Sequence, residues 1–286
     1  MANVRVIRRR IRSVRNTAKI TKAMQMVAAS KMRRAQLTTL AGRPYSQKIR
    51  EVLADLMAQP AEGDDIHPLL RRREVKHSQL IFITPDRGLC GGLPSSLNRA
   101  AGQFLLGSQV PVGVVTVGKK GRDFMVRTGR DVKAVFTGMP DRPTIGDVSP
   151  VAHMAMEDYT AGNVDQVLLC YAEFVNTVIQ RPVIQQLLPV QPAELKAGEA
   201  VGYIYEPASL QVLGALLPRF VEMQIYHALL EANASEQSAR MVAMRNATDN
   251  ANDLIDSLTL LMNKVRQETI TKELLDLVGG VAALEG

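Results

Sequence analysis

The first fifty residues of this chain contain no acidic side chain. They hold 14 lysine and arginine residues, whereas the other 236 residues hold 21 basic and 28 acidic ones. A basic segment attached to an otherwise acidic chain indicates that the segment meets a partner of opposite charge.

Cysteine is scarce, and long apolar runs are missing. Cys90 and Cys170 lie far apart, and neither has a second cysteine or a histidine at metal-ligand spacing. This usage is typical of reduced thiols and argues against a disulfide scaffold. No apolar run approaches the roughly 20 residues that span a bilayer, and no secretory signal follows the basic start.

Glycine and proline are absent from residues 1–41 and again from 219–278, which predicts two long helices. In both segments small and apolar residues recur at alternating spacings of four and three, as in a coiled coil. The predicted N-terminal seam is Ile7, Ile11, Val14, Ala18, Thr21, Gln25, Ala28, Met32 and Ala35. The predicted C-terminal seam is Met244, Ala247, Ala251, Leu254, Leu258, Leu261 and Val265.

The ends of these helices are less sharply marked. The first helix is expected to extend to Met57, with a kink or break at Gly42 and Pro44. The glycine pair 279–280 predicts the end of the second helix. Because the two helices come from opposite ends of the chain, we expect them to pair antiparallel, with the C-terminal helix overhanging its partner.

The middle of the chain alternates strand-like and helical segments. Val-, Ile-, Leu- and Phe-rich runs are expected to form strands at 79–84, 110–117, 132–137, 164–175 and 183–188, with helices at 93–106, 119–129 and 146–161. The predicted fold class is therefore α/β, with a small Rossmann-like α/β domain inserted between two long terminal helices that form an antiparallel coiled coil. The predicted segments are 1–57, 77–190 and 207–286.

Candidate chemistry is weak throughout. The glycine-rich turn 86–92 follows a predicted strand but matches neither phosphate-binding motif, so turn packing is favoured over nucleotide binding. The four histidines are scattered and have no ligand or base motif beside them. We expect no catalytic residue, no cofactor and no metal.

Four interpretations of the basic segment remain open at this point. It could bind nucleic acid, although residues 1–44 contain no aromatic side chain for base stacking. It could be a targeting peptide, a solvated surface, or a rod inside a ring of acidic protein loops. Mutual repulsion among so many like charges favours a partner over solvent alone.

Four long motifs identify a family. They are 11–32, Asp86–Leu93, 234–250 and Arg266–Leu274, and together they resemble the gamma subunit of F-type ATP synthases over essentially the full length. The resemblance implies a non-catalytic central-stalk rotor whose paired helices fill the bore of an alpha/beta hexamer, with the α/β domain as a foot on the membrane c-ring and the epsilon subunit beside it. It implies a peripheral location on the cytoplasmic face of a bacterial inner membrane.

The resemblance also suggests contact residues. Candidates for contacts with beta or for stabilising the shaft are Lys22, Met24, Arg33, Arg240, Gln267 and Thr271. Candidates for the c-ring and epsilon foot are Arg87, Cys90, Tyr205 and Glu206. The apolar tip from Leu274 to Leu284 is expected to slide in a hydrophobic sleeve.

Overall fold

A computed structural model describes residues 4–58, 67–191 and 209–285. Two compact units make up the chain: one contains Met1–Ala28 and Met241–Gly286, and the other contains Ala29–Arg240. Both long helices, α1 (Val4–Ala58) and α5 (Ser209–Glu285), contribute to both units. The compact units therefore divide the chain within the helices, and the three segments expected from the sequence stay a prediction.

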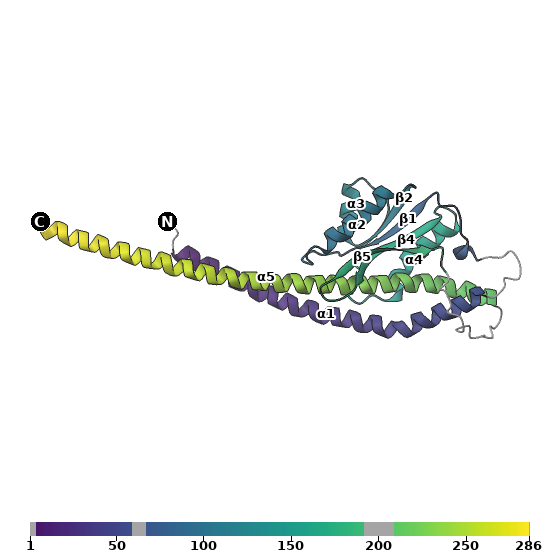
Figure 1. Cartoon of the computed structure of the whole chain (residues 1–286), viewed down its shortest axis with the longest axis horizontal. Coiled ribbons are helices and arrows are strands. Elements are labelled where there is room, and N and C mark those ends of the chain that lie inside the picture. Colours follow the sequence, from purple (N-terminus) through teal and green to yellow (C-terminus); the bar gives the residue numbers. More distant parts are fainter. Residues whose placement is uncertain (1–3, 59–66, 192–208, 286) are drawn as a thin grey trace. The chain divides into compact units, whose positions relative to one another are not determined.

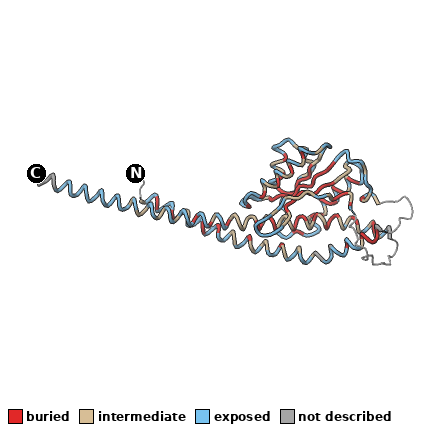
Figure 2. Tube along the Cα trace, viewed as in Figure 1, coloured by how far each residue is buried: buried red, intermediate tan, exposed pale blue. Residues whose placement is uncertain are grey.

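The first unit is an antiparallel helix pair formed by the outer ends of α1 and α5 (Figure 1). Of the predicted α1 seam residues in this unit, from Ile7 to Ala28, all but Val14 and Gln25 are less than 9 % exposed, and those two are half-buried. Beyond the end of α1, residues 266–281 of α5 are all exposed, as the pale colour of this end in Figure 2 shows. The predicted single-helix overhang is therefore present in the fold.

The α5 seam differs from the predicted one at alternate positions. Met244, Ala251, Leu258 and Val265 face the partner helix, but Leu254 and Leu261 are 47 % and 44 % exposed. The intervening seam residues are Thr248, Ile255 and Met262. The sequence prediction placed Leu254 and Leu261 in the seam because leucine is hydrophobic. In the structure the helix is rotated so that Thr248 lies in the seam, where it hydrogen-bonds to Thr21 of α1.

The structure shows no helix break at Gly42 and Pro44 and no helix end at Gly279 and Gly280, and the alternative of a kink at Gly42 and Pro44 stays a prediction. Helix α1 continues through Pro44 to Ala58. Helix α5 continues through Gly279 and Gly280 to Glu285, so the predicted stop signal is wrong. Glycine weakens a helix without terminating it unless the backbone adopts a left-handed cap, and neither glycine has a left-handed φ.

The second unit is a three-layer α/β domain. Its strands are β1 (Ser78–Ile83), β2 (Val112–Val117), β3 (Val132–Phe136), β4 (Gln166–Phe174) and β5 (Gln180–Leu188). They form one sheet in the order β3-β2-β1-β4-β5, parallel except for the edge strand β5. The helices α2 (Leu93–Gly107), α3 (Lys119–Arg127) and α4 (Ile145–Thr160), with the short 3-10 turn η1 (Pro68–Leu70), complete the domain. The predicted α/β fold class is confirmed.

Alternation along the strands divides the core between the two faces of the sheet. On β1, Leu80 and Phe82 pack with α2 and α3, while Ile81 and Ile83 pack with α4. The second face also receives residues 49–56 of α1 and 213–229 of α5. These parts of the long helices are thus core elements of the α/β domain, which explains why the compact unit includes them.

Candidate functional site

Several basic residues of α1 line up along one flank of the helix pair. Five exposed basic residues each follow a seam residue by one position, and we call them the cationic flank. They are Arg8, Arg12, Arg15, Lys19 and Lys22. None of them has an acidic partner within 4.0 Å in the described part of the chain. The predicted positive surface is therefore beside the seam, where its charge is left uncompensated by α5.

The opposite flank of α1 is different in character. Ile20 and Val27 are 60 % and 55 % exposed, and Met24 between them is half-buried. Their spacing of four and three residues places them along one line of the helix surface. The helix pair thus presents a positively charged flank and an apolar flank, with the predicted contact residues Lys22 and Met24 on opposite sides.

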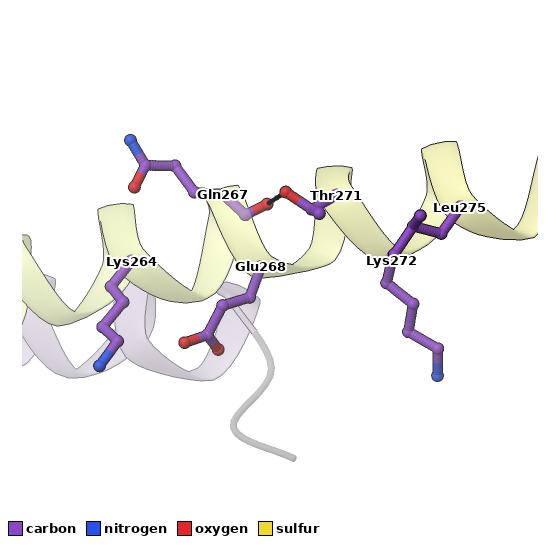
Figure 3. Close-up of a pocket in the computed structure, with 6 residues that line it drawn as sticks. All are labelled: Lys264, Gln267, Glu268, Thr271, Lys272 and Leu275. Atoms are coloured by element: carbon purple, nitrogen blue, oxygen red, sulfur yellow. Dashed lines mark hydrogen bonds between the residues drawn. The ribbon is translucent and has the colours of Figure 1, made fainter.

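The overhanging part of α5 carries an open groove of about 480 Å³. Its six lining residues, shown in Figure 3, are Lys264, Gln267, Glu268, Thr271, Lys272 and Leu275. All belong to one face of one helix, and the Thr271 hydroxyl donates 3.0 Å to the backbone oxygen of Gln267. A groove lined by a single helix cannot enclose a small molecule, so this face is suited to a partner surface.

In the α/β unit, the glycine-rich turn is held by its own carboxylate. Asp86 accepts hydrogen bonds from the backbone N–H groups of Lys119 and Gly138, both at 2.8 Å. The N–H of Lys119 lies at the start of α3, where a helix attracts anions. An internal carboxylate therefore occupies the start of α3 and ties the turn to two other loops of the unit. The prediction that turn packing is favoured over nucleotide binding stays a prediction.

The same turn is fastened to α5. Arg240 donates 3.2 Å to the Gly88 carbonyl and pairs with Glu236 at 2.6 Å. The Arg240 and Glu236 side chains are only 12 % and 20 % exposed. Burial raises the pKa of Glu236, and the neighbouring Arg240 guanidinium opposes that rise. Arg240 is thus engaged within the chain, and its predicted role in a contact with beta or in stabilising the shaft stays a prediction.

One residue of this turn combines a strained backbone with an exposed side chain. Leu89 has a φ of 63°, a conformation that is uncommon outside glycine, and it is 62 % exposed. Arg87 is also exposed, whereas Cys90 is buried, and burial raises the pKa of its thiol. Of the residues predicted for the foot, Arg87 can therefore reach a partner and Cys90 is an internal residue; Tyr205 and Glu206 lie outside the described residues.

A second contact joins a neighbouring loop to both long helices. Lys31 pairs with Asp141 at 2.6 Å, and this hydrogen bond lowers the pKa of the Asp141 carboxyl. Asn233 donates 2.9 Å to the Asp141 backbone oxygen. Sequence reasoning missed Glu236, Asp86 and Asp141, and only the four-residue spacing of Glu236 and Arg240 could have signalled one of these contacts.

Metal-ligating side chains do not gather within the described residues. Within them, no three histidine, cysteine or acidic side chains group as a metal would require. The described helices include none that is both long and apolar enough to cross a bilayer. The remaining predicted contacts, Arg33, Gln267 and Thr271, are exposed on the two long helices, and their roles stay predictions.

Comparisons with known proteins agree on one family. The family model described as ATP synthase matches residues 3–284. The chain is 58 % identical to an ATP synthase gamma chain of Dehalococcoides mccartyi over 284 residues, covering 99 % of this chain and all of that one. It is 49 % identical to a gamma chain of Chloroflexus aurantiacus over 288 residues, with 99 % of each chain covered.

Solved structures show the same architecture. A central-stalk chain of the Tetrahymena thermophila mitochondrial ATP synthase has a TM-score of 0.61 at 28 % identity, covering 80 % of this chain and 99 % of that one. A chain of the Euglena gracilis mitochondrial enzyme has a TM-score of 0.67 at 18 % identity, covering 98 % and 94 %, and shows the fold. With the full-length match to bacterial relatives, the chain belongs to the gamma-chain family of ATP synthase.

Proposed function

We propose that this chain is the rotor of a proton-driven ATP synthase and couples rotation of the membrane c-ring to conformational change at the beta-subunit catalytic sites. The observation that carries the proposal is the two-flanked helix pair with its exposed α5 overhang, in a chain of the gamma family. The chain itself is non-catalytic in this scheme, and catalysis belongs to the beta subunits.

The division of the helix pair gives each partner a surface. Acidic loops of beta would face the cationic flank, where the uncompensated charge of residues 8–22 attracts them. The alpha and beta subunits together would enclose the apolar flank and the overhang, where Leu274, Leu277 and Val278 are all more than half exposed. Apolar contacts are non-directional, so they permit rotation without breaking ordered hydrogen bonds.

The α/β unit would supply a second set of partner contacts. Its loops are fastened to α5 through Arg240 and Asn233, so a force applied to this unit is passed to the long helix. We place the c-ring and epsilon against this unit, on the cytoplasmic face of the bacterial inner membrane. The chain would thus be a peripheral membrane protein that owes its location to its partners.

Copurification tests the assignment directly. A tagged chain isolated from detergent-solubilised native membranes is expected to bring down alpha, beta, epsilon and c subunits. The double variant R15Q/K22Q should bind alpha and beta more slowly, with a smaller decrease in rate as salt is raised from 50 to about 150 mM. K272Q, which removes one exposed lysine from the overhang, is the control. Unchanged rates and salt dependence in R15Q/K22Q would refute the role of the cationic flank.

A further inference from the structure

A buried pair of threonine hydroxyls joins α1 to α5 inside the helix-pair unit. Thr21 and Thr248 are each 8 % exposed, and their Oγ1 atoms lie 2.7 Å apart although the residues are 227 positions apart in sequence. Threonine hydroxyls in helices ordinarily bond to a carbonyl of their own helix. A direct bond across the seam is therefore a specific feature of this layer.

The acceptors near the two hydroxyls indicate which one donates the bond across the seam. The Thr248 hydroxyl lies 2.8 Å from the Met244 carbonyl, which accepts its single proton. Its oxygen can then accept the Thr21 hydroxyl proton, whose other acceptor, the Ala18 carbonyl, is farther away at 3.1 Å. The chain of bonds runs from Thr21 to Thr248 to the α5 backbone. Each hydroxyl also has an acceptor on its own helix, so what depends on the two residues staying level is the 2.7 Å bond between them.

Short side chains adjoin the threonine pair, whereas larger apolar residues such as Ile11 and Met244 pack elsewhere in the seam. Ala18, Ala28 and Ala251 are buried in the seam on either side of the threonine pair. Alanine has no long side chain to interlock with the facing helix, so these alanine positions themselves distinguish weakly between nearby axial positions. Gln25, one turn away on α1, has a buried Oε1 without a hydrogen-bond partner among the described residues. Its Oε1 therefore adds no second hydrogen bond that would fix the axial position of the helices.

We propose that Thr21 and Thr248 are positioning residues that fix the axial stagger of α1 and α5 in the rotor. The inference rests on the proposed function for its purpose, because a rotor that transmits torque must keep its two helices from sliding past each other. A single buried polar pair that specifies register, at no gain in stability, is a known use of polar seam residues in coiled coils.

Spin-label distances measure the stagger in the assembled complex. Labels at N16C and T269C, both exposed positions, differ in axial level by about 24 Å at 1.5 Å per residue, so their separation changes with sliding. The unsubstituted seam is expected to give one narrow distance. T21V/T248V, which keeps side-chain shape, should give a broadened distribution or a second population shifted by about 5 Å, the rise of half a heptad.

Matched variants separate stagger from stability. T21S/T248S retains both hydroxyls and is expected to restore the narrow distance. T259V removes a hydroxyl of α5 that bonds 2.7 Å to its own Ile255 carbonyl, and it should leave the distance unchanged. The thermal midpoint of T21V/T248V should be equal to or above that of the parent, because the substitution makes the seam more apolar.

The outcomes decide the proposal independently of rotation. A narrow, unshifted distance in T21V/T248V overturns it, as does equal broadening in T259V. If T21V/T248V does not assemble, T21V alone gives the same measurement, since Thr248 keeps its bond to Met244. Loss of coupled ATP synthesis in the labelled parent would count against the proposed function, whereas the distances would still report the stagger.

Discussion

Replacing Arg240 with methionine is expected to release the glycine-rich turn from α5. Methionine keeps the length and apolar stem of the side chain but removes the 2.6 Å ion pair with Glu236 and the 3.2 Å bond to the Gly88 carbonyl. Both bonds are charge-assisted, because the guanidinium donates each of them. The ion pair contributes about 1.5–3 kcal/mol, and the longer bond to the carbonyl contributes about 1.5 kcal/mol, the low end of that range. Protonation of Glu236 relieves part of the loss, which leaves a net cost of about 2 kcal/mol.

Hydrogen exchange measures this cost where it arises. A change of about 2 kcal/mol in local opening corresponds to roughly 30-fold faster exchange in peptides covering 86–92. The measurement uses the purified complex, and the control is R245M, since Arg245 is 72 % exposed and its partner Asp249 is 4.0 Å away. Surface pairs of this kind contribute little, so R245M should change exchange by less than about threefold.

The companion variant tests the electrostatic reasoning. Adding E236Q to R240M removes the carboxylate that has lost its partner. The loss of exchange protection in the double variant should therefore be smaller than the sum of the losses in R240M and in E236Q. Burial already raises the pKa of Glu236, and removing Arg240 raises it further. The folded chain then holds this proton more tightly than the unfolded chain. In R240M, this contribution to protection should be fully present below pH 4.5, the ordinary pKa of the glutamate carboxyl, and should decrease as pH rises through the raised folded pKa.

Two results would refute this account of the turn. Unchanged exchange at 86–92 in R240M would mean that the turn is held by Asp86 alone. Strictly additive losses in the double variant would mean that Glu236 and Arg240 do not act as a pair. Either result would also remove the argument that the α/β unit passes force to α5 through this contact.

Three further predictions follow from other parts of the chain. G118A should destabilise the α/β unit by about 3 kcal/mol or more in urea titrations. The φ of Gly118 is 111°, and a Cβ at this position would lie 2.0 Å from the Thr84 carbonyl oxygen. The control is G107A, whose added Cβ meets open space and should be tolerated. Burial and Arg50 lower the pKa of His227, so the folded chain binds the imidazole proton less tightly than the unfolded chain does. The free energy of unfolding should therefore fall as pH drops below 6.5. H227F should remove that part of the pH dependence in thermal unfolding. Deleting 275–286 should leave proton-coupled ATP synthesis partly intact, because the described residues of this end are exposed up to 281; complete loss of assembly would contradict the sliding contact.

Local sequence patterns were sufficient for the elements of the fold. The strands and helices between 78 and 188 begin and end within a few residues of the predicted bounds, apart from β5, whose start at Gln180 precedes the predicted Val183. These boundaries are marked by turn residues and by changes in apolar period, which are properties of neighbouring residues. The α1 seam was predictable for the same reason, because its basic residues leave one stripe for the interior.

Tertiary contacts decided what local patterns left ambiguous. On α5 both Leu254 and Ile255 are apolar, and only pairing with α1 selects Ile255 for the seam. Gly279 is compatible with helix or cap, and the neighbouring residues carry the helix past it. Tertiary contacts also decided the polar partners. Arg240 binds the Gly88 carbonyl beside its pair with Glu236. The Asp86 carboxylate binds the start of α3, 33 residues away in sequence. Sequence alone determined that this chain has two long helices with a basic flank and an inserted sheet; the pairing of buried polar groups, which depends on three-dimensional proximity, was decided only by the folded structure.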